Sequence, residues 1–153
     1  MPRAPFQVLV IPYRHVPDGG IVYAIFKRVA ASGGFWQGIA GGGEDDETPL
    51  EAARREAFEE AGIAPDNLFV PLDSFCTVPV TAVERGFLWG NSVLVLPEHA
   101  FGVRLADDQI QLSPEHEQFA WLTYDDAWAA LKWDSNRNAL WELDYRLRHR
   151  RDT

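Results

Sequence analysis

The chain has 153 residues, 46% of them hydrophobic, which is enough for one domain with a real core. Its longest apolar runs have only the length of strands, which excludes a transmembrane helix. The formal charge of −9 is concentrated in residues 41–63, where eight acids and two bases give −6. The remaining 15 acids and 12 bases give only −3. This distribution argues against a nucleic-acid-coating surface and favours a local cation-binding patch.

The N-terminal third predicts strands. Residues 6–14 and 20–28 are rich in β-branched and aromatic residues and enclose a loop of turn formers. The N-terminus has one early Arg and no cleavage site after a long apolar core, so we interpret it as the first strand rather than a signal peptide. Residues 33–43 carry glycines on both sides of a short apolar stretch, which predicts a brief strand ending in a flexible loop.

A helix is predicted over residues 49–61, where start and stop signals agree. Thr48 is a good N-cap, Pro49 suits the first helical position, and Glu51 completes a T-x-x-E capping box. Gly62 stands where a residue in the left-handed conformation would end the helix.

The rest of the chain predicts strands followed by helices. Two longer strands are expected at 68–82 and 86–96, and a short strand at 118–124. Two helices are expected at 124–132 and 134–150. Residues 97–118 are polar and have no clear assignment. Several strands with one early and two late helices indicate an α/β fold with a mixed sheet, and we expect a single domain over residues 1–153.

Cys76 is the only cysteine, so an intrachain disulfide is excluded. A chain without disulfides fits a reducing compartment, and the cytoplasm is the expected location. In its apolar context, Cys76 is interpreted as a small core residue rather than a catalytic thiol.

Three carboxylates crowd one side of the predicted helix. At ~100° of rotation per residue, Glu59 and Glu60 fall within an arc of about 100° with Glu56, whereas small apolar residues gather on another face. Like charges three or four positions apart each cost about 0.2–0.5 kcal/mol. One interpretation is a solvated acidic face that Arg55 partly offsets. The other is a divalent-cation site, which the preceding glycines favour, because carboxylates and backbone carbonyls are the ligands that Mg²⁺ or Mn²⁺ prefers.

Residues 41–63 resemble the Nudix box, G-x5-E-x7-R-E-U-x-E-E-x-G-U, in which U is a bulky aliphatic residue. Every fixed position matches, from Gly41 and Glu47 to the segment Arg55–Ile63. Ala57 in the first aliphatic slot and Ala40 before the box are departures. The flanks, including "EHEQFAWL" at 115–122, are similar to the dihydroneopterin triphosphate pyrophosphohydrolases and the diadenosine tetraphosphate hydrolases.

The resemblance implies a Nudix-type α/β/α sandwich around a mixed sheet and roles for the matching residues. Metal ligands are expected at Gly41 (by its carbonyl), Glu56, Glu59, Glu60 and Glu115. Arg55 and Glu47 are expected to hold the loop against the helix and to orient Glu56. The general base stays open between Glu56, Glu59 and a carboxylate outside the box.

Residues before the glycine-rich loop are candidates for binding the substrate. Phe35 and Trp36 could stack on a base or pterin, and Gln37 could bind its edge. Arg28 could reach a phosphate. Asn136 is a further, weaker candidate. No covalent-nucleophile motif is present.

The expected function is Mg²⁺-dependent cleavage, by water at phosphorus, of a pyrophosphate bond in a dihydroneopterin triphosphate or (deoxy)nucleoside triphosphate, with Mn²⁺ as an alternative ion. A dinucleoside polyphosphate hydrolase and a non-catalytic nucleotide-binding module stay open as alternatives. The expected partner is a small nucleotide-like polyphosphate, without a membrane or nucleic acid. The sequence fixes neither the substrate, the number of metal ions nor the oligomeric state, and a homodimer stays open.

Overall fold

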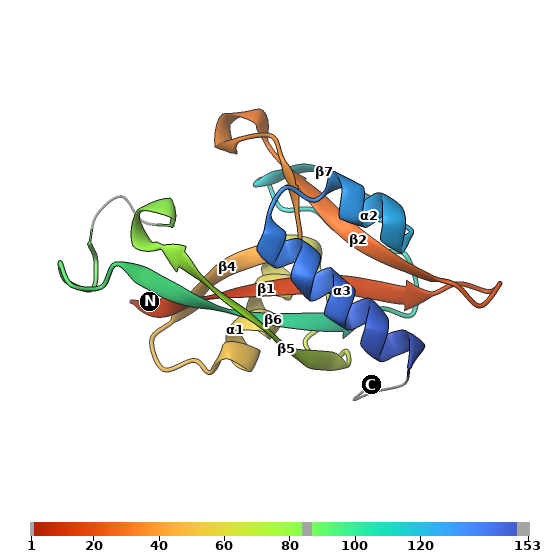
Figure 1. The fold of residues 1–153 in the computed structure, drawn as a ribbon, viewed down its shortest axis with the longest axis horizontal. Helices are drawn as coiled ribbons and strands as arrows, with labels where there is room; N and C mark the ends of the chain where they lie inside the picture. The colour runs from red at the N-terminus through yellow and green to blue at the C-terminus, as the bar shows by residue number, and fades with distance from the viewer. Residues whose placement is uncertain (1, 84–86, 150–153) are drawn as a thin grey trace.

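The computed structural model describes residues 2–83 and 87–149, which form a seven-stranded sheet with helices on both faces (Figure 1). The strands are β1 (Arg3–His15), β2 (Ile21–Arg28), β3 (Trp36–Gln37), β4 (Ile39–Glu44), β5 (Phe69–Pro79), β6 (Val95–Arg104) and β7 (His116–Leu122). The helices are α1 (Pro49–Ala61), α2 (Tyr124–Ala130) and α3 (Asp134–Arg148), with short 3-10 turns at Ala30–Ser32 and Val80–Ala82.

Strand β1 is the centre of the sheet. The strand order is β3-β2-β1-β6-β5, while β4 pairs with β1 and β7 pairs with β2. Along one edge, β1 pairs first with β4 and then, near its end, with β2; along the other edge it pairs with β6. The β1–β6 pairing is parallel and the others are antiparallel, which confirms the predicted mixed sheet.

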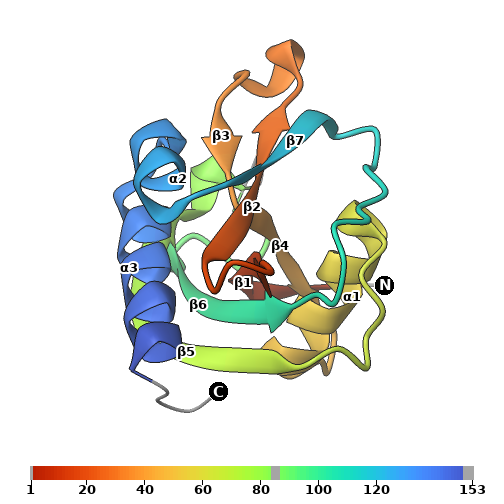
Figure 2. The same cartoon turned by 90° about the vertical axis from the view of Figure 1, so that its right-hand side faces the viewer.

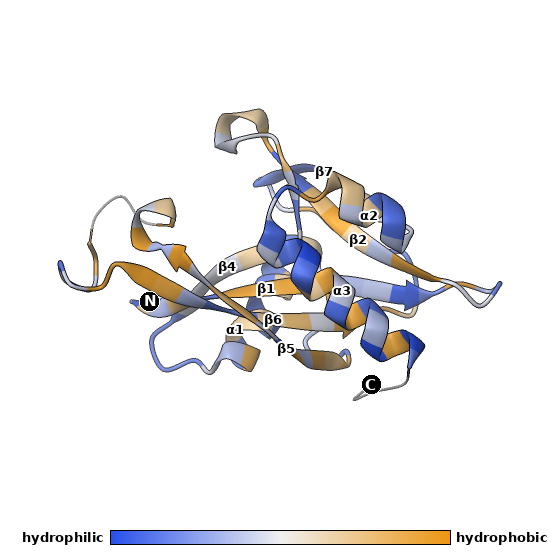
Figure 3. Cartoon of the chain, viewed as in Figure 1, coloured by the Kyte–Doolittle hydropathy of each residue, from blue (hydrophilic) through white to orange (hydrophobic). Residues whose placement is uncertain are grey.

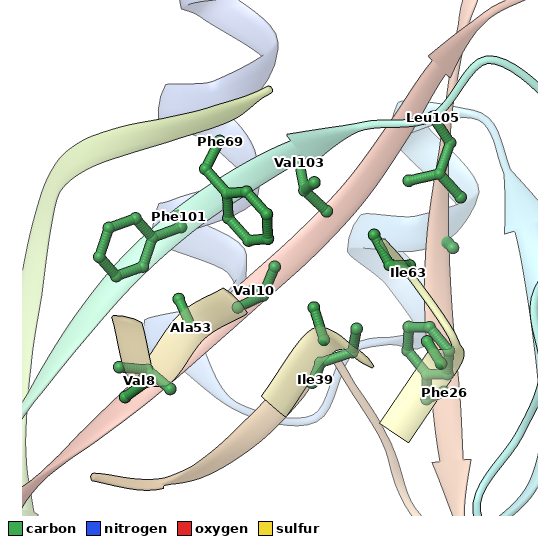
Figure 4. Close-up of a cluster of buried hydrophobic side chains, with 14 residues drawn as sticks. Val8, Val10, Phe26, Ile39, Ala53, Ile63, Phe69, Phe101, Val103 and Leu105 are labelled. Carbon is green, nitrogen blue, oxygen red and sulfur yellow. The ribbon is translucent and has the colours of Figure 1, made fainter. Parts of the chain in front are cut away.

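Two hydrophobic clusters lie on opposite faces of the sheet. Alternation along β1 sends Val8 toward α1 and Leu9 toward α3, because successive strand residues point to opposite faces. In the first cluster, Ala53 of α1 packs with residues of β1 and β6 (Figure 4). In the second, Leu143 of α3 is fully buried. Helix α1 therefore covers one face, and α2 and α3 the other, which confirms the α/β/α sandwich (Figure 2).

Helix α1 has the predicted ends. The side chain of Thr48 accepts a hydrogen bond from the backbone N–H of Glu51 at 3.2 Å, and the Glu51 carboxylate accepts from the Thr48 N–H at 2.9 Å. Gly62 ends the helix in the left-handed conformation, with φ of 69°. The helix over 49–61 is confirmed at both ends because its signals are local.

Helix α3 is amphipathic, as predicted, with Leu140, Leu143 and Leu147 buried and Trp141 53% exposed. Hydrophilic and hydrophobic residues alternate along it in Figure 3. Its hydrophobic side faces β5 and β6, so the helix closes the second cluster.

The strand predicted over 86–96 is wrong. Residue 86 lies outside the described part of the chain, and residues 87–94 form turns, with Gly90 at φ of 100°. Strand β6 instead begins at Val95 and runs through part of the unassigned segment 97–118. The exposed apolar residues of this turn have the composition that is typical of a strand, which led to the wrong prediction. The polar pair Glu98–His99 interrupts the apolar pattern of β6, so that strand was not predicted.

Strand β5 contains an irregularity that α3 stabilises. Three residues separate Pro71 from Phe75, whereas one separates their partners on β6. The backbone N–H groups of Asp73 and Ser74, within this bulge, donate to the carboxylate of Glu142 at 2.7 and 2.6 Å. Glu142 thus satisfies donors that the strand ladder leaves free, and it joins α3 to β5.

No helix among residues 2–83 and 87–149 is both long and apolar enough to cross a membrane.

We predict that Glu142→Gln destabilises the fold by about 1–3 kcal/mol at pH 7, as expected when charged hydrogen bonds are weakened. Burial opposes ionisation of Glu142, but hydrogen bonds from Ser74, Asp73 and Arg146 hold its pKa below the usual value. A depressed pKa in the folded state stabilises the fold above the unfolded pKa, and this contribution is lost as the pH falls through the folded pKa. The difference between variant and wild type should therefore shrink below about pH 4. Urea unfolding across pH measures it.

The control is Asp134→Asn on the same helix, where the side chain is 94% exposed. It should change the free energy of unfolding by less than about 0.5 kcal/mol. Equal effects of the two substitutions at pH 7 would contradict the role of Glu142.

Candidate functional site

A cavity of about 970 Å³ lies between the glycine-rich strand β4, the acidic side of α1, and the start of α3. Its volume is in the range of small-molecule sites. Ten of the candidate site residues from the sequence line it: Arg28, Phe35, Gln37, Gly41, Arg55, Glu56, Glu59, Glu60, Glu115 and Asn136. Glu47 and Trp36 are not among its lining residues.

Gly41 lies against the carboxylate of Glu56. A Cβ atom at position 41 would be 2.1 Å from Cδ of Glu56, so any side chain there would displace this carboxylate. The absence of a side chain lets strand β4 approach α1 and places the carboxylate beside the backbone of the strand. The glycine of this motif is therefore required by the packing of Glu56 and not by a turn.

Arg55 joins three segments of the site. Its Nε and Nη2 donate to the carboxylate of Glu47 at 2.8 and 3.0 Å, and Nη2 also donates to the carbonyl of Gly42 at 2.8 Å. Its Nη1 donates to Glu56 at 3.0 Å and to Glu59 at 3.3 Å. The guanidinium thus links strand β4, the loop before α1, and the acidic side of α1. It also holds the pKa of Glu47 below its usual value.

Glu56 and Glu60 are buried, with only 9% and 7% of their surface exposed, which excludes a fully solvated acidic face. Glu59 is the exposed member of the three. Burial raises the pKa of Glu56 to about 7, although Arg55 acts in the opposite direction. A carboxyl group that changes protonation near neutral pH can accept or give up a proton under physiological conditions.

Glu60 has its own set of partners, one from the segment before β7 and one from the start of that strand. Ser113 donates to its carboxylate at 2.7 Å, and Nδ1 of His116 lies 3.3 Å away. Burial alone would raise the pKa of Glu60, but these partners hold it below the usual value. Burial and the neighbouring Glu60 raise the pKa of Glu115, whose carboxylate lies 3.8 Å from Arg28.

The carboxylates do not converge on one point. In the part of the chain that the structure describes, no group of three or more His, Cys, Asp or Glu side chains is arranged to hold a metal ion. The repulsion expected on α1 is relieved instead by Arg55, which contacts Glu56 and Glu59, and by the partners of Glu60. These carboxylates and the neighbouring glycine carbonyl are nevertheless the type of hard oxygen donor that Mg²⁺ binds. Because bound Mg²⁺ retains several waters, a few protein ligands suffice to hold it.

The aromatic pair before β4 is divided between two faces. Phe35 lines the cavity, where its ring lies 5.2 Å from that of Trp133, and Gln37 lines it as well. Trp36 packs instead against the hydrophobic cluster under α2 and α3. The expected stacking role of Trp36 is therefore wrong, because adjacent residues of an extended segment point to opposite sides.

Sequence reasoning missed several polar residues of the site. Gln7, Glu98 and Cys76 line the cavity from three strands. His116 is buried and contacts Glu60. Asn136, the weaker candidate from the sequence, lines the cavity, and its amide oxygen accepts a hydrogen bond from the backbone N–H of Gly38 at 2.8 Å, so this side chain holds the start of β4 against α3. The sequence signal that could have identified these residues is the polar residue that interrupts an otherwise apolar strand segment.

Solved structures share this fold over nearly the whole chain. A Listeria monocytogenes protein assigned to the NUDIX hydrolases is 35% identical, with 97% of each chain covered and a TM-score of 0.85. The E. coli dihydroneopterin triphosphate pyrophosphohydrolase is 24% identical (94% and 99% covered, TM-score 0.72), and a C. elegans Ap4A hydrolase is 20% identical (95% and 99% covered, TM-score 0.73). At these lower identities the last two show the fold alone.

A Myxococcus xanthus protein, an octanoyltransferase, is 29% identical over 103 residues, which are 64% of this chain but only 25% of that protein. The chain thus spans about a quarter of the curated relative that it matches. The NUDIX domain family model matches residues 16–143, which include the box, α1 and most of α3. The chain therefore belongs to the NUDIX family.

Proposed function

We propose that this chain is a divalent-metal-dependent pyrophosphohydrolase that acts on a nucleoside triphosphate-like substrate, as a single cytoplasmic domain. The observation that carries the proposal is the buried Glu56 carboxylate, held between Gly41 and Arg55 at the wall of a cavity large enough for a nucleotide. A purely structural ion pair would need neither the glycine nor the cavity.

The carboxylates of Glu56, Glu59, Glu60 and Glu115 and the carbonyl of Gly41 are the donors that would hold Mg²⁺, with Mn²⁺ as an alternative. When bound, such an ion supplies neutralisation of the phosphate charge and a more acidic water. The proposed reaction forms a bond from a water oxygen to phosphorus and breaks the phosphorus–oxygen bond of the anhydride. The water proton passes to a carboxylate, and a phosphate or pyrophosphate leaves.

Arg55 and Glu47 are positioning residues in this proposal. The two hydrogen bonds between them fix the guanidinium, whose remaining N–H donors hold Glu56. Glu56, Glu59 and Glu115 stay candidates for the general base, because each is a carboxylate at the wall of the cavity. Arg28, beside Glu115, is suited to contact a phosphate.

Substrates of two kinds fit the cavity. Phe35 and Gln37 at its wall suit a single base or pterin attached to a triphosphate. A dinucleoside polyphosphate is the alternative within the family, and a nucleotide-binding module without turnover is the alternative outside catalysis. The presence of every carboxylate of the box favours hydrolysis, because binding alone does not require a buried base.

The first experiment is release of phosphate or pyrophosphate from a panel of nucleoside triphosphates, dihydroneopterin triphosphate and diadenosine tetraphosphate, with Mg²⁺, Mn²⁺ or EDTA. We expect turnover of at least one triphosphate with either metal and none in EDTA. Tight nucleotide binding without turnover of any compound would instead support a binding module.

We predict that Glu56→Gln lowers kcat by at least about 100-fold, because the amide can neither accept a proton nor neutralise a cation. The thermal unfolding midpoint should stay within a few degrees of the wild type. Glu117→Gln is the matched control, since Glu117 is exposed on β7 and does not line the cavity. Near-normal turnover by Glu56→Gln would refute the assignment of Glu56.

We also predict that Gly41→Ala lowers kcat/KM by about 100-fold, because the new methyl group would displace Glu56 and a shift of about 1 Å in a catalytic group has an effect of this size. Gly20→Ala is the control: its new Cβ would meet only Asp18 and Val16, at 3.2 and 3.3 Å. Steady-state kinetics of both variants, with circular dichroism to check folding, provides the measurement. Equal kinetics of the two variants would contradict the role of the close contact at Gly41.

A further inference from the structure

One side of the cavity is a row of residues in register across four strands. Gly42 of β4 pairs with Gln7 of β1, Gln7 pairs with Glu98 of β6, and Glu98 pairs with Cys76 of β5. All four line the cavity. Neighbouring strands are about 4.8 Å apart, so Glu98 lies roughly 10 Å from Gly42, about the length of a nucleoside.

This row marks where the sheet emerges from beneath α3. Two residues further along the strands, on the same face, Leu9 pairs with Ala100, and both are buried in the cluster under α3. Glu98 is therefore the first residue of β6 on this face that α3 leaves open to the cavity. Its place next to a hydrophobic cluster would ordinarily favour an apolar side chain.

Glu98 lacks the cation that usually accompanies a carboxylate in such surroundings. Across residues 2–83 and 87–149, no Lys, Arg or His forms an ion pair with it, and the one hydrogen bond of its carboxylate is from Sγ of Cys76 at 3.4 Å, a weak donor. Burial raises the pKa of Glu98, which reflects the same shortage of partners. A carboxylate has two oxygens in one plane, and both can accept from a pair of adjacent N–H groups.

We propose that Glu98 selects substrates whose ring carries two adjacent N–H donors, the 2-amino-4-oxopyrimidine unit of guanine and of pterins. Adenine, cytosine and uracil do not present two adjacent donors on one edge, and hypoxanthine lacks the 2-amino group. The inference deepens the proposed function and rests on it for the position of the phosphates, which would lie beside Gly41 and Glu56. Glu98 is then a specificity-determining residue, roughly 10 Å across the strands from Gly42, the neighbour of Gly41.

The test compares GTP with ITP, which differ only in the 2-amino group. Wild-type kcat/KM should favour GTP by at least about tenfold, since a site that hydrogen-bonds a donor discriminates strongly against a substrate without it. In Glu98→Gln, the amide NH₂ group faces a substrate donor, so the preference should collapse to about twofold or less. Glu117→Gln, the same change outside the cavity, should keep the wild-type ratio. Including dihydroneopterin triphosphate distinguishes a pterin substrate from a guanine one.

Equal use of GTP and ITP by the wild type, or an unchanged ratio in folded Glu98→Gln, would overturn the role of Glu98 while leaving hydrolysis intact. If Glu98→Gln does not fold, the wild-type ratio alone decides. If the wild type hydrolyses neither nucleotide, the wider substrate panel decides separately whether it is a hydrolase, and calorimetric binding of GTP and ITP decides on recognition: a tenfold preference supports Glu98, whereas equal or absent binding overturns it.

Discussion

The site depends on the Arg55 guanidinium and the surroundings that hold it. Arginine has five N–H donors in a fixed plane, and here they reach a strand carbonyl, a loop carboxylate and two helix carboxylates. A lysine offers a single charged atom and could not join these groups in one plane. The approach of β4 to α1 brings the partners within reach, and Gly41 allows that approach. Charge and packing are therefore inseparable at this site.

The parts of the structure that local chemistry determines could be predicted from the sequence. Helix α1 has its capping box and its terminal glycine, so its bounds followed from adjacent residues. Strand β6 was misplaced because its polar residues Glu98 and His99 face a cavity and an aromatic cluster that only the folded sheet creates. Trp36 was assigned to the wrong side because the sequence does not say which neighbour faces the core.

The residues proposed for the reaction are close together in the sequence, whereas those proposed for substrate selectivity are not. The acidic residues and Arg55 lie within 23 consecutive positions, so the spacing alone exposes them. Their burial could not be read from the helical wheel, because the segment before β7 covers Glu60 from more than 50 residues away. Gln7, Cys76 and Glu98 meet only through strand pairing, and no short motif connects them. A sequence pattern of this family therefore reports the reaction more readily than the substrate.

The bulge in β5 separates the length of this strand from the composition of the cavity wall. Beyond the bulge, Cys76 pairs with Glu98, and paired residues of neighbouring strands face the same side of a sheet, so Cys76 faces the cavity. A bulge absorbs extra residues without changing the pairing that follows it. A change of length between Pro71 and Phe75 would therefore alter the contact of the bulge with Glu142 and leave the cavity wall in register.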